Sequence, residues 1–205
     1  MPQNLREAFG NIDIYLFDQL LKGRFDAGQQ VLDAGCGNGR NLVYFLRHNF
    51  NVFGIDLNPN AIQEVQQLAN RLAPTLPPEN FRITSIENMA FPAETFDLVI
   101  ASAVLHFAEN PIHFDLMLRA LWRVLKPGGF LFVRLASSIG IEHLVQPLAN
   151  GRYYLPDGSE RFLVDERTLH RYTRELNGEL YEPLKTTNVQ NQRCMTTWCL
   201  QKKAI

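Results

Sequence analysis

Residues 31–40 read Val-Leu-Asp-Ala-Gly-Cys-Gly-Asn-Gly-Arg, and this stretch decides the fold. A short apolar run ends in three glycines at alternate positions, which predicts a strand, a sharp loop and then a helix that begins near Asn38 or Gly39. Glycines let the loop approach a ligand closely, and the first amides of the helix would face that ligand. Asp33 closes the first strand, and Asp56 ends the next apolar run, residues 51–56. Two carboxylates around a glycine loop suit a ligand with hydroxyls and a cationic group.

Composition places the chain among single-domain globular proteins. Its 205 residues suffice for one well-buried domain, and a hydrophobic content of 46% argues against disorder. The net charge is -1 without a basic run, so we expect a small-molecule partner rather than nucleic acid. The start of the chain lacks a signal-like segment, and no apolar run nears the roughly 20 residues that span a bilayer. We therefore expect a cytoplasmic monomer or homodimer with no membrane partner.

The cysteines point to a reducing compartment. Cys36, Cys194 and Cys199 show neither a disulfide framework nor the spacing of zinc ligands. We expect free thiols and no metal site.

Hydrophobic periodicity predicts strands that alternate with helices. Apolar residues at three- to four-residue spacing predict a helix over residues 5–20, which Gly10 and Asn11 would break or bend. Asn58-Pro59 and Asn110-Pro111 each place a capping residue before a proline, a favoured helix start. Such alternation implies a parallel sheet with helices on both faces and a ligand site where the strand order reverses. The predicted strands are residues 30–34, 51–56, 81–84, 96–102 and 130–135.

The last third of the chain departs from this alternation. Residues 137–165 mix glycines and prolines with apolar residues, so we interpret them as an irregular insertion over the site rather than a linker. Asp165 is placed to cap a further helix. Residues 181–189 and 195–201 are predicted to form two closing strands.

Four motifs in order resemble those of class I S-adenosylmethionine-dependent methyltransferases. They are the glycine loop, Asp-Leu-Asn-Pro at 56–59, Phe-Pro-Ala-Glu-Thr-Phe-Asp-Leu-Val at 91–99 and Leu-Trp-Arg-Val-Leu-Lys-Pro-Gly-Gly-Phe at 121–130. Together they cover roughly residues 28–136. The resemblance implies an α/β fold with a Rossmann-like, doubly wound sheet of about seven strands, mostly parallel with an antiparallel closing strand. One domain, residues 1–205, would comprise an N-terminal helical lid (1–28), a cofactor-binding core (29–136), the insertion over the active site (137–165) and a closing helix with a strand pair (166–205).

The same resemblance implies S-adenosylmethionine as cofactor and S-adenosylhomocysteine as product. Asp56 would accept hydrogen bonds from the ribose diol, or else serve as a helix cap beside Asn58. Asp33 would support the ammonium group of the amino acid tail, or else brace the loop amides. Ser85 stands where the family often has an acid, so its hydroxyl would meet the adenine amine. The expected cofactor-binding residues are Asp33, Gly35, Cys36, Gly37, Gly39, Asp56, Leu57, Ser85, Ile86, Glu87 and Ala101.

The acceptor pocket is expected beyond the fourth predicted strand. His106 is the candidate catalytic residue, because an ordinary pKa near neutrality suits contact with the acceptor or removal of its proton; a packing histidine is the alternative. Aromatic residues of the first helix and of the insertion would close the pocket as lids, or else belong to the ordinary core. The expected pocket residues are Tyr15, His106, His143, Tyr153 and Tyr154.

We therefore predict an enzyme that moves a methyl group from the sulfonium to a small-molecule acceptor by in-line displacement, driven mainly by positioning and water exclusion. The sequence leaves the acceptor atom (O, N, S or C) open. One alternative is a non-catalytic cofactor-binding subunit or sensor. Another is a nicotinamide-dependent oxidoreductase, which shares the strand-loop-helix start but needs glycine at the position of Arg40.

Overall fold

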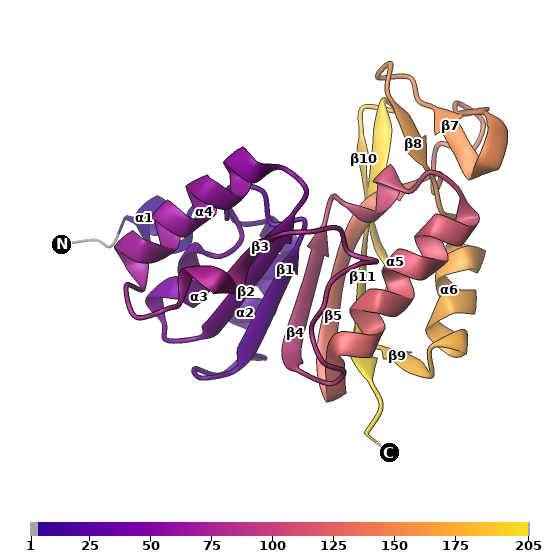
Figure 1. The fold of residues 1–205 in the computed structure, drawn as a ribbon. Coiled ribbons are helices and arrows are strands. Elements are labelled where there is room, and N and C mark those ends of the chain that lie inside the picture. Colours follow the sequence, from indigo (N-terminus) through magenta and orange to yellow (C-terminus); the bar gives the residue numbers. More distant parts are fainter. Residues whose placement is uncertain (1–3, 205) are drawn as a thin grey trace.

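A mixed sheet of eight strands runs through the computed structural model, which describes residues 4–204 (Figure 1). The strand order is β10-β11-β5-β4-β1-β2-β3, and β9 also pairs with β11. The strands are β1 (Gln30–Ala34), β2 (Asn51–Asp56), β3 (Phe81–Ile83), β4 (Phe96–Ser102), β5 (Leu125–Ser137), β9 (Gly178–Leu180), β10 (Lys185–Val189) and β11 (Arg193–Lys202).

The pairing directions confirm the predicted sheet. Strands β1 to β5 pair in parallel, whereas β11 runs antiparallel to β5, β9 and β10. β1 lies between β2 and β4, so the chain order reverses between β1 and β4. The carboxyl ends of β1 and β4 therefore mark the switch point at which doubly wound sheets bind ligands.

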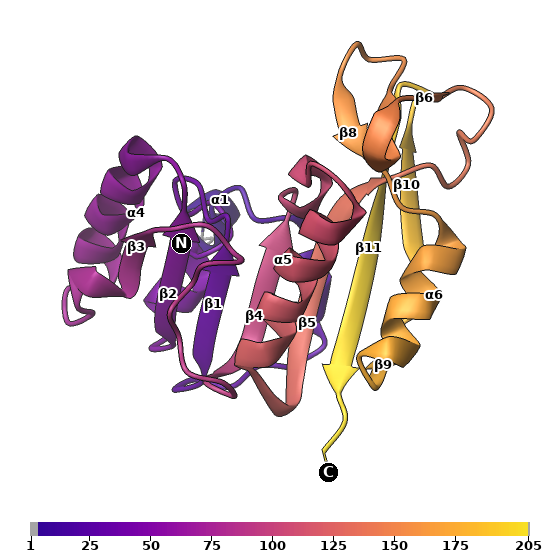
Figure 2. The same cartoon turned by 45° about the vertical axis from the view of Figure 1, so that its right-hand side comes forward.

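Helices cover both faces of the sheet. Buried residues of α2, α3 and α4 form one core cluster with Val31 of β1, and those of α5 and α6 form the other with Leu32. Successive strand residues point to opposite faces, so one strand serves both cores. In Figure 2, α5 and α6 lie in front of the sheet. The helices are α1 (Leu5–Phe9), α2 (Ile14–Leu21), α3 (Val43–Arg47), α4 (Pro59–Leu72), α5 (Pro111–Val124) and α6 (Glu166–Glu175), with short 3₁₀ turns η1 (Pro78–Asn80), η2 (Leu105–Phe107) and η3 (Ala149–Gly151).

Side-chain caps start the long helices where the sequence predicts. The side chains of Asn58, Asn110 and Asp165 accept hydrogen bonds from backbone amides of the first turns of α4, α5 and α6. Prolines occupy the first turns of α4 and α5, where a missing N–H costs nothing.

The N-terminal helical segment breaks into two helices at the predicted glycine. Gly10 has φ +66°, and a Cβ there would lie 2.8 Å from Val43 Cγ2. Asp13 then caps α2 by accepting a hydrogen bond from the Tyr15 amide at 3.0 Å. The left-handed glycine ends the first helix, and the cap begins the second.

The helix after the glycine loop begins later than predicted. α3 starts at Val43 rather than at Asn38 or Gly39, and it has five residues. Gly35, Gly37 and Gly39 all have positive φ, so this segment cannot continue as a right-handed helix. The glycine loop therefore exposes its own backbone at the end of β1, and the N-terminus of α3 lies further along the chain than expected.

The insertion is more regular than predicted. It holds an antiparallel sheet of β6 (Gln146–Pro147), β7 (Arg152–Tyr154) and β8 (Glu160–Phe162), which projects beyond the carboxyl end of β5 (Figure 1). Strands of two or three residues leave too short a pattern to read from sequence. For the same reason β9 went unpredicted. The strand β5 also begins earlier than expected and includes the Pro127–Gly129 segment.

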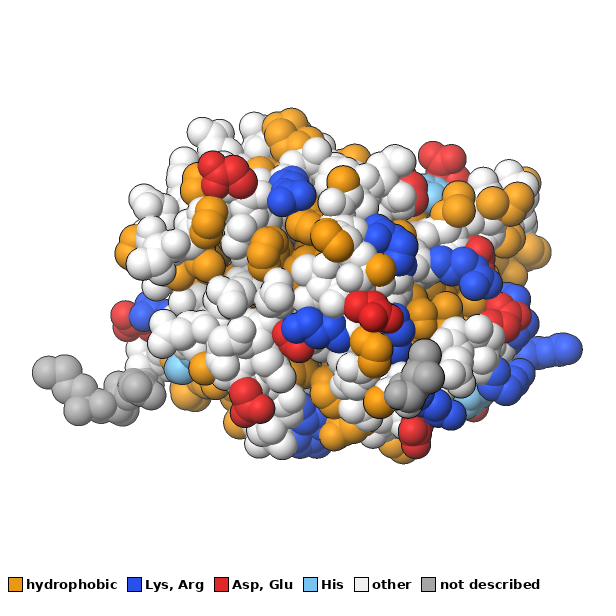
Figure 3. Space-filling model, turned by 60° about the horizontal axis from the view of Figure 1, so that its bottom comes forward, with side chains coloured by type: hydrophobic (Ala, Val, Ile, Leu, Met, Phe, Trp, Pro, Cys, Tyr) orange, Lys and Arg blue, Asp and Glu red, His pale blue; other side chains and the backbone are white. Residues whose placement is uncertain are grey.

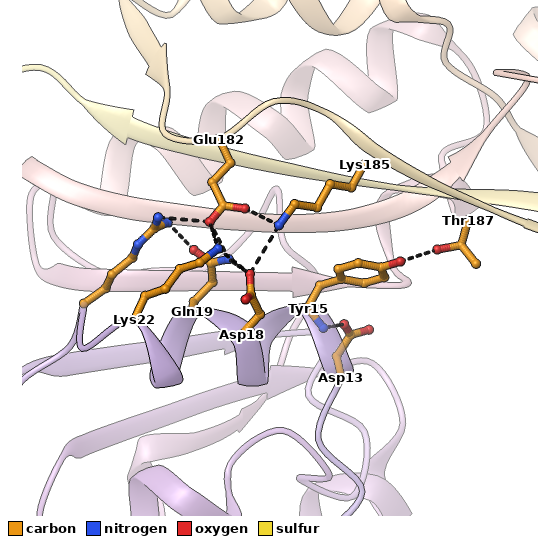
Figure 4. A network of polar contacts seen from close by, with 9 residues as sticks. Asp13, Tyr15, Asp18, Gln19, Lys22, Glu182, Lys185 and Thr187 are labelled. Carbon is orange, nitrogen blue, oxygen red and sulfur yellow. Dashed lines mark hydrogen bonds and ion pairs between the residues drawn. The ribbon is translucent and has the colours of Figure 1, made fainter.

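A polar network joins α2 to the end of the chain (Figure 4). Glu182 accepts hydrogen bonds from Gln19 and Lys22 and pairs with Arg24 at 2.9 Å. Lys185 bridges Glu182 to Asp18. Alongside these contacts, the Tyr15 hydroxyl lies 2.7 Å from Thr187 Oγ1. This network docks the N-terminal segment against the closing strands.

We predict that Glu182→Gln loosens this docking. Burial raises the pKa of Glu182, but hydrogen bonds from Lys185, Lys22 and Gln19 outweigh it and hold the pKa at about 2. The stabilisation is therefore present above the unfolded pKa and is lost as the pH falls from about 4.3 toward 2. Urea unfolding at pH 7 should show a loss of about 1–3 kcal/mol that shrinks at pH 3.

Glu64, exposed on α4, gives the matched control. Glu64→Gln should leave the free energy of unfolding within about 0.5 kcal/mol of the parent. An equal effect of both substitutions at pH 7 would contradict the docking role of Glu182.

Candidate active site

The glycine loop is tied directly to β2. The amides of Gly35 and Cys36 both donate to the Ile55 carbonyl, at 2.8 and 2.9 Å. Gly35 has φ +78°, and a Cβ there would lie 2.7 Å from Val104 Cγ2. Only glycine satisfies both the backbone angle and the close approach. The loop backbone thus lies against the segment that follows β4.

Asp56 is held rigidly at the end of β2. Its Oδ2 accepts the Gly37 amide at 2.9 Å, and its Oδ1 accepts the Asn58 amide at 2.9 Å. A carboxylate has about four acceptor sites, so each oxygen retains one for a further donor. The side chain therefore acts as a local cap and can still accept from two hydroxyls of a diol.

Asp33 lies behind the loop, out of contact with water. It is 1% exposed, and neither carboxylate oxygen has a hydrogen-bond partner among residues 4–204. Burial raises its pKa to about 7 and Asp56 adds to the rise, while Arg40 and the nearby Asn41 side chain, which lies outside hydrogen-bond geometry, oppose it. The loop amides donate to Ile55 instead, so Asp33 does not brace them. A buried carboxylate without a hydrogen-bond partner is destabilising unless a cation joins it.

A cavity of about 380 Å³ opens at the switch point, beside the loop and the end of β2. Six of the predicted cofactor-binding residues line it: Gly35, Asp56, Leu57, Ser85, Ile86 and Glu87. The other lining residues are Thr84, Ala103, Val104, Phe107, Glu109, His113 and Met117. The first set comes from motifs that the sequence reveals. The second comes from the segment after β4 and from α5, except Thr84, which follows β3.

The other five predicted cofactor residues do not line the cavity: Asp33, Cys36, Gly37, Gly39 and Ala101. Cys36 is 4% exposed, and its thiol donates to the Gly37 carbonyl at 3.5 Å. A Cβ on Gly39 would meet Val65 of α4 at 2.7 Å, so this glycine lets the loop pack on the helix. Ala101 is fully buried inside β4.

His113 and Glu109 are cavity residues that the sequence reading missed. His113 Nε2 lies 3.7 Å from Glu87 Oε2 across the cavity wall. The Asn110-Pro111 start of α5 was the available signal, because it places the first turn of that helix near the carboxyl end of β4.

A second cavity of about 280 Å³ adjoins the first, and Ala103 lines both. Ala103 has φ +62°, a left-handed conformation in which its amide donates to the Arg134 carbonyl at 2.7 Å. The other lining residues are His106, Arg134, Ala136, Leu155, Asp157, Ser159, Arg161, Val189, Arg193 and Met195.

His106 faces this second cavity as a neutral side chain. Its Nδ1 accepts the Ala136 amide at 3.1 Å, so the ring hydrogen belongs on Nε2. Burial lowers the pKa of His106 to about 4, with a further contribution from Arg161. In this state the ring offers a hydrogen-bond donor and has no free nitrogen to take a proton from an acceptor.

The four other predicted pocket residues are dispersed. The Tyr15 hydroxyl contacts Thr187, and the Arg134 guanidinium lies over the Tyr15 ring, 5.3 Å from the ring centroid. Tyr153 packs on the apolar cluster of the insertion, and Tyr154 and His143 are exposed. The linings of the two cavities include none of these four. The insertion contributes to the second cavity through other residues, Leu155 to Arg161.

The surface in Figure 3 shows acidic and basic side chains next to one another over the face in view. Within the described part of the chain, no group of three or more His, Cys, Asp or Glu side chains is arranged to hold a metal ion. The helices between residues 4 and 204 are all too short or too polar to cross a membrane.

Residues 32–133 match the family model described as a methyltransferase domain, a range that runs from within β1 to within β5 and includes the glycine loop. The chain belongs to the class I S-adenosylmethionine-dependent methyltransferases. It is 31% identical over 140 residues to the ubiquinone biosynthesis O-methyltransferase of Pseudomonas aeruginosa, a match that covers 62% of this chain and 56% of the relative. The chain spans between 36% and 56% of the lengths of the first three curated relatives.

Solved structures share the fold of this methyltransferase chain. A methyltransferase of Methanosarcina mazei superposes with a TM-score of 0.71 at 19% identity, covering 91% of this chain and 98% of that one. The [4+2]-cyclase SpnF gives 0.72 at 18% identity, covering 92% and 81%. At such identities the likeness concerns the fold alone, and function rests on the site.

We predict that Gly35→Ala lowers the free energy of unfolding by more than the cost of its positive φ angle alone. Gly128 has φ +79° but open space around it, so Gly128→Ala carries only the backbone cost of about 1 kcal/mol. Gly35→Ala adds the clash with Val104, and we expect a loss of about 2–4 kcal/mol in thermal or urea unfolding. Equal losses in the two variants would show that the contact with Val104 relaxes freely.

Proposed function

We propose that the chain binds S-adenosylmethionine in the first cavity and transfers its methyl group to a small-molecule acceptor held in the second. The observation that carries this proposal is the presence of two different carboxylates at the loop. Asp56 is fixed and half-buried, and Asp33 is buried with no hydrogen-bond partner in the described part of the chain. A ribose diol suits the first, and the ammonium group of an amino acid tail suits the second. The residues present therefore fit this cofactor.

When bound, S-adenosylmethionine supplies a methyl group activated by the positive sulfur. The chain's own task is to orient both reactants and to exclude water. Asp56 accepts from the ribose, and Asp33 offsets the ammonium charge. Ser85 accepts a hydrogen bond from the Asn88 side chain at 2.8 Å, and its hydroxyl, which contacts the Glu87 carboxylate, is placed in the cavity lining to donate to the adenine.

The second cavity supplies the acceptor side of the reaction. It touches the first only at Ala103, so an acceptor there would lie next to the loop and the segment after β4. We propose that His106 orients this acceptor by donating from Nε2, because Nδ1 is occupied by the Ala136 amide. An acceptor that is already nucleophilic then needs no protein base.

The direct test is calorimetric binding of S-adenosylmethionine, followed by an acceptor screen for S-adenosylhomocysteine. We predict that Asp56→Ala weakens cofactor binding at least about tenfold, because the ribose loses a charge-assisted acceptor. The exposed Glu64→Ala should bind normally. Unchanged affinity in Asp56→Ala would remove the ribose assignment, and binding without turnover across the screen would favour a non-catalytic cofactor-binding subunit.

We predict that Asp33→Asn makes the ligand-free protein more stable and weakens its binding of the cofactor. Because the folded pKa is raised, stability is lost as the pH rises from about 4 through 7, where the buried carboxyl ionises. At pH 8 the free energy of unfolding of the ligand-free variant should therefore be about 1–3 kcal/mol higher than that of the parent. Its affinity for S-adenosylhomocysteine, which carries the same ammonium group, should fall at least about tenfold.

Asp97 offers the opposite behaviour as a control. It lies at the far end of β4, where Lys126 pairs with it at 2.9 Å and the Gln30 amide donates to it at 2.8 Å. Asp97→Asn should lower stability and leave ligand affinity unchanged. If Asp33→Asn binds S-adenosylhomocysteine normally, the ammonium assignment fails.

A further inference from the structure

The second cavity is unusually rich in guanidinium groups. Arg134, Arg161 and Arg193 line it, together with a single carboxylate, Asp157. The geometry points to an acceptor that carries an anionic group, a carboxylate or a phosphate, on an apolar body. This inference rests on the proposed function, because it names the acceptor class for the same active site.

Arg161 carries the unneutralised charge. Its Nη1 donates to the Glu160 backbone carbonyl at 2.7 Å, and its guanidinium lies 5.0 Å from the ring centroid of Phe107. No carboxylate among residues 4–204 lies within ion-pair distance of it; the Glu160 side chain pairs with Arg152 instead. Phe107 belongs to the lining of the first cavity, so this cation lies at the junction of the two cavities.

Arg134 is oriented from behind. Its Nη1 donates to Asp13 Oδ2 at 2.8 Å, and the Tyr15 ring lies beneath the guanidinium. Its Nε is buried and has no partner in the described part of the chain. A buried N–H without an acceptor is costly, and an oxygen of a bound anion would satisfy it. Asp13 is itself fully buried at its side chain, so it fixes Arg134 without reaching the ligand.

Arg193 adds less net positive charge to the cavity, because its guanidinium lies 3.4 Å from the Asp157 carboxylate. Counted together with Asp13 behind Arg134, the three arginines still exceed the two carboxylates by one positive charge. Guanidinium groups bind carboxylate and phosphate oxygens through paired hydrogen bonds, which favours these anions over neutral ligands.

Apolar residues complete the cavity. Ala136, Leu155 and Met195 belong to the apolar cluster of the insertion, and Val189 adds to the wall. A volume of about 280 Å³ is near the lower end for small-molecule sites. Together these features describe a small organic anion rather than an extended polymer.

Three small probes test this inference on the protein saturated with S-adenosylhomocysteine: benzoate, phenyl phosphate and benzamide, titrated calorimetrically. Benzamide has the shape of benzoate without the charge. We predict that benzoate, phenyl phosphate or both bind at least about tenfold more tightly than benzamide, and the tighter of the two anions identifies the anionic group. Equal binding of all three, or no binding of either anion, would overturn the inference.

Variants localise the effect. Arg161→Gln and Arg134→Gln should each abolish the preference for the anion, whereas Arg161→Lys should retain part of it. Arg167→Gln, at an exposed arginine of α6, is the matched control and should bind like the parent. Anion binding that survives Arg161→Gln would also overturn the inference. Affinity for S-adenosylhomocysteine is measured for each variant, so a failure of the cofactor site is distinguished from a failure of the acceptor site.

Discussion

The hydrogen bonds between the glycine loop and the end of β2 are the constraint on which the site depends. One carbonyl, that of Ile55, receives two loop amides, and Asp56 receives a third from Gly37. These contacts fix the loop in its left-handed course and fix the Asp56 carboxylate at the same time. They also leave Asp33 behind the loop without a donor. The same contacts therefore position the Asp56 carboxylate and leave the Asp33 carboxylate buried and destabilising, a combination that is common at functional sites.

The two cavities use different parts of the sheet. The first lies at the ends of β1 and β2, against the start of α5, and the second lies over β5 and the closing strands. The N-terminal segment contributes from behind through Asp13 and Tyr15, both of which contact Arg134. The network around Glu182 holds this segment against the closing strands, so the docking of α2 and the position of the Arg134 guanidinium in the second cavity are physically connected.

Much of the fold could be predicted from sequence because its signals are local. Alternate glycines, the Asn-Pro caps and the acids at strand ends each act within a few residues, and they predicted the sheet, the long helices and the carboxylates at the first cavity. The late start of α3 could not be predicted, because the positive φ angles of Gly35, Gly37 and Gly39 depend on the packing of the loop. The contact between Arg134 and Asp13 could not be predicted, because 121 positions separate the two residues in sequence and no local pattern indicates such a contact.

The hairpin between β7 and β8 contributes to one cavity only, and this has a consequence for how the two cavities can diverge. Residues 35–117 supply the whole lining of the first cavity, while positions 155–161 of the hairpin between β7 and β8 enter only the second. The second cavity also takes Ala103 and His106 from within the first stretch, so the two linings interleave in the segment after β4. Arg161 is also the hairpin side chain that reaches Phe107 of the first cavity, so exchange of the hairpin would reshape the second cavity and alter the first through this contact.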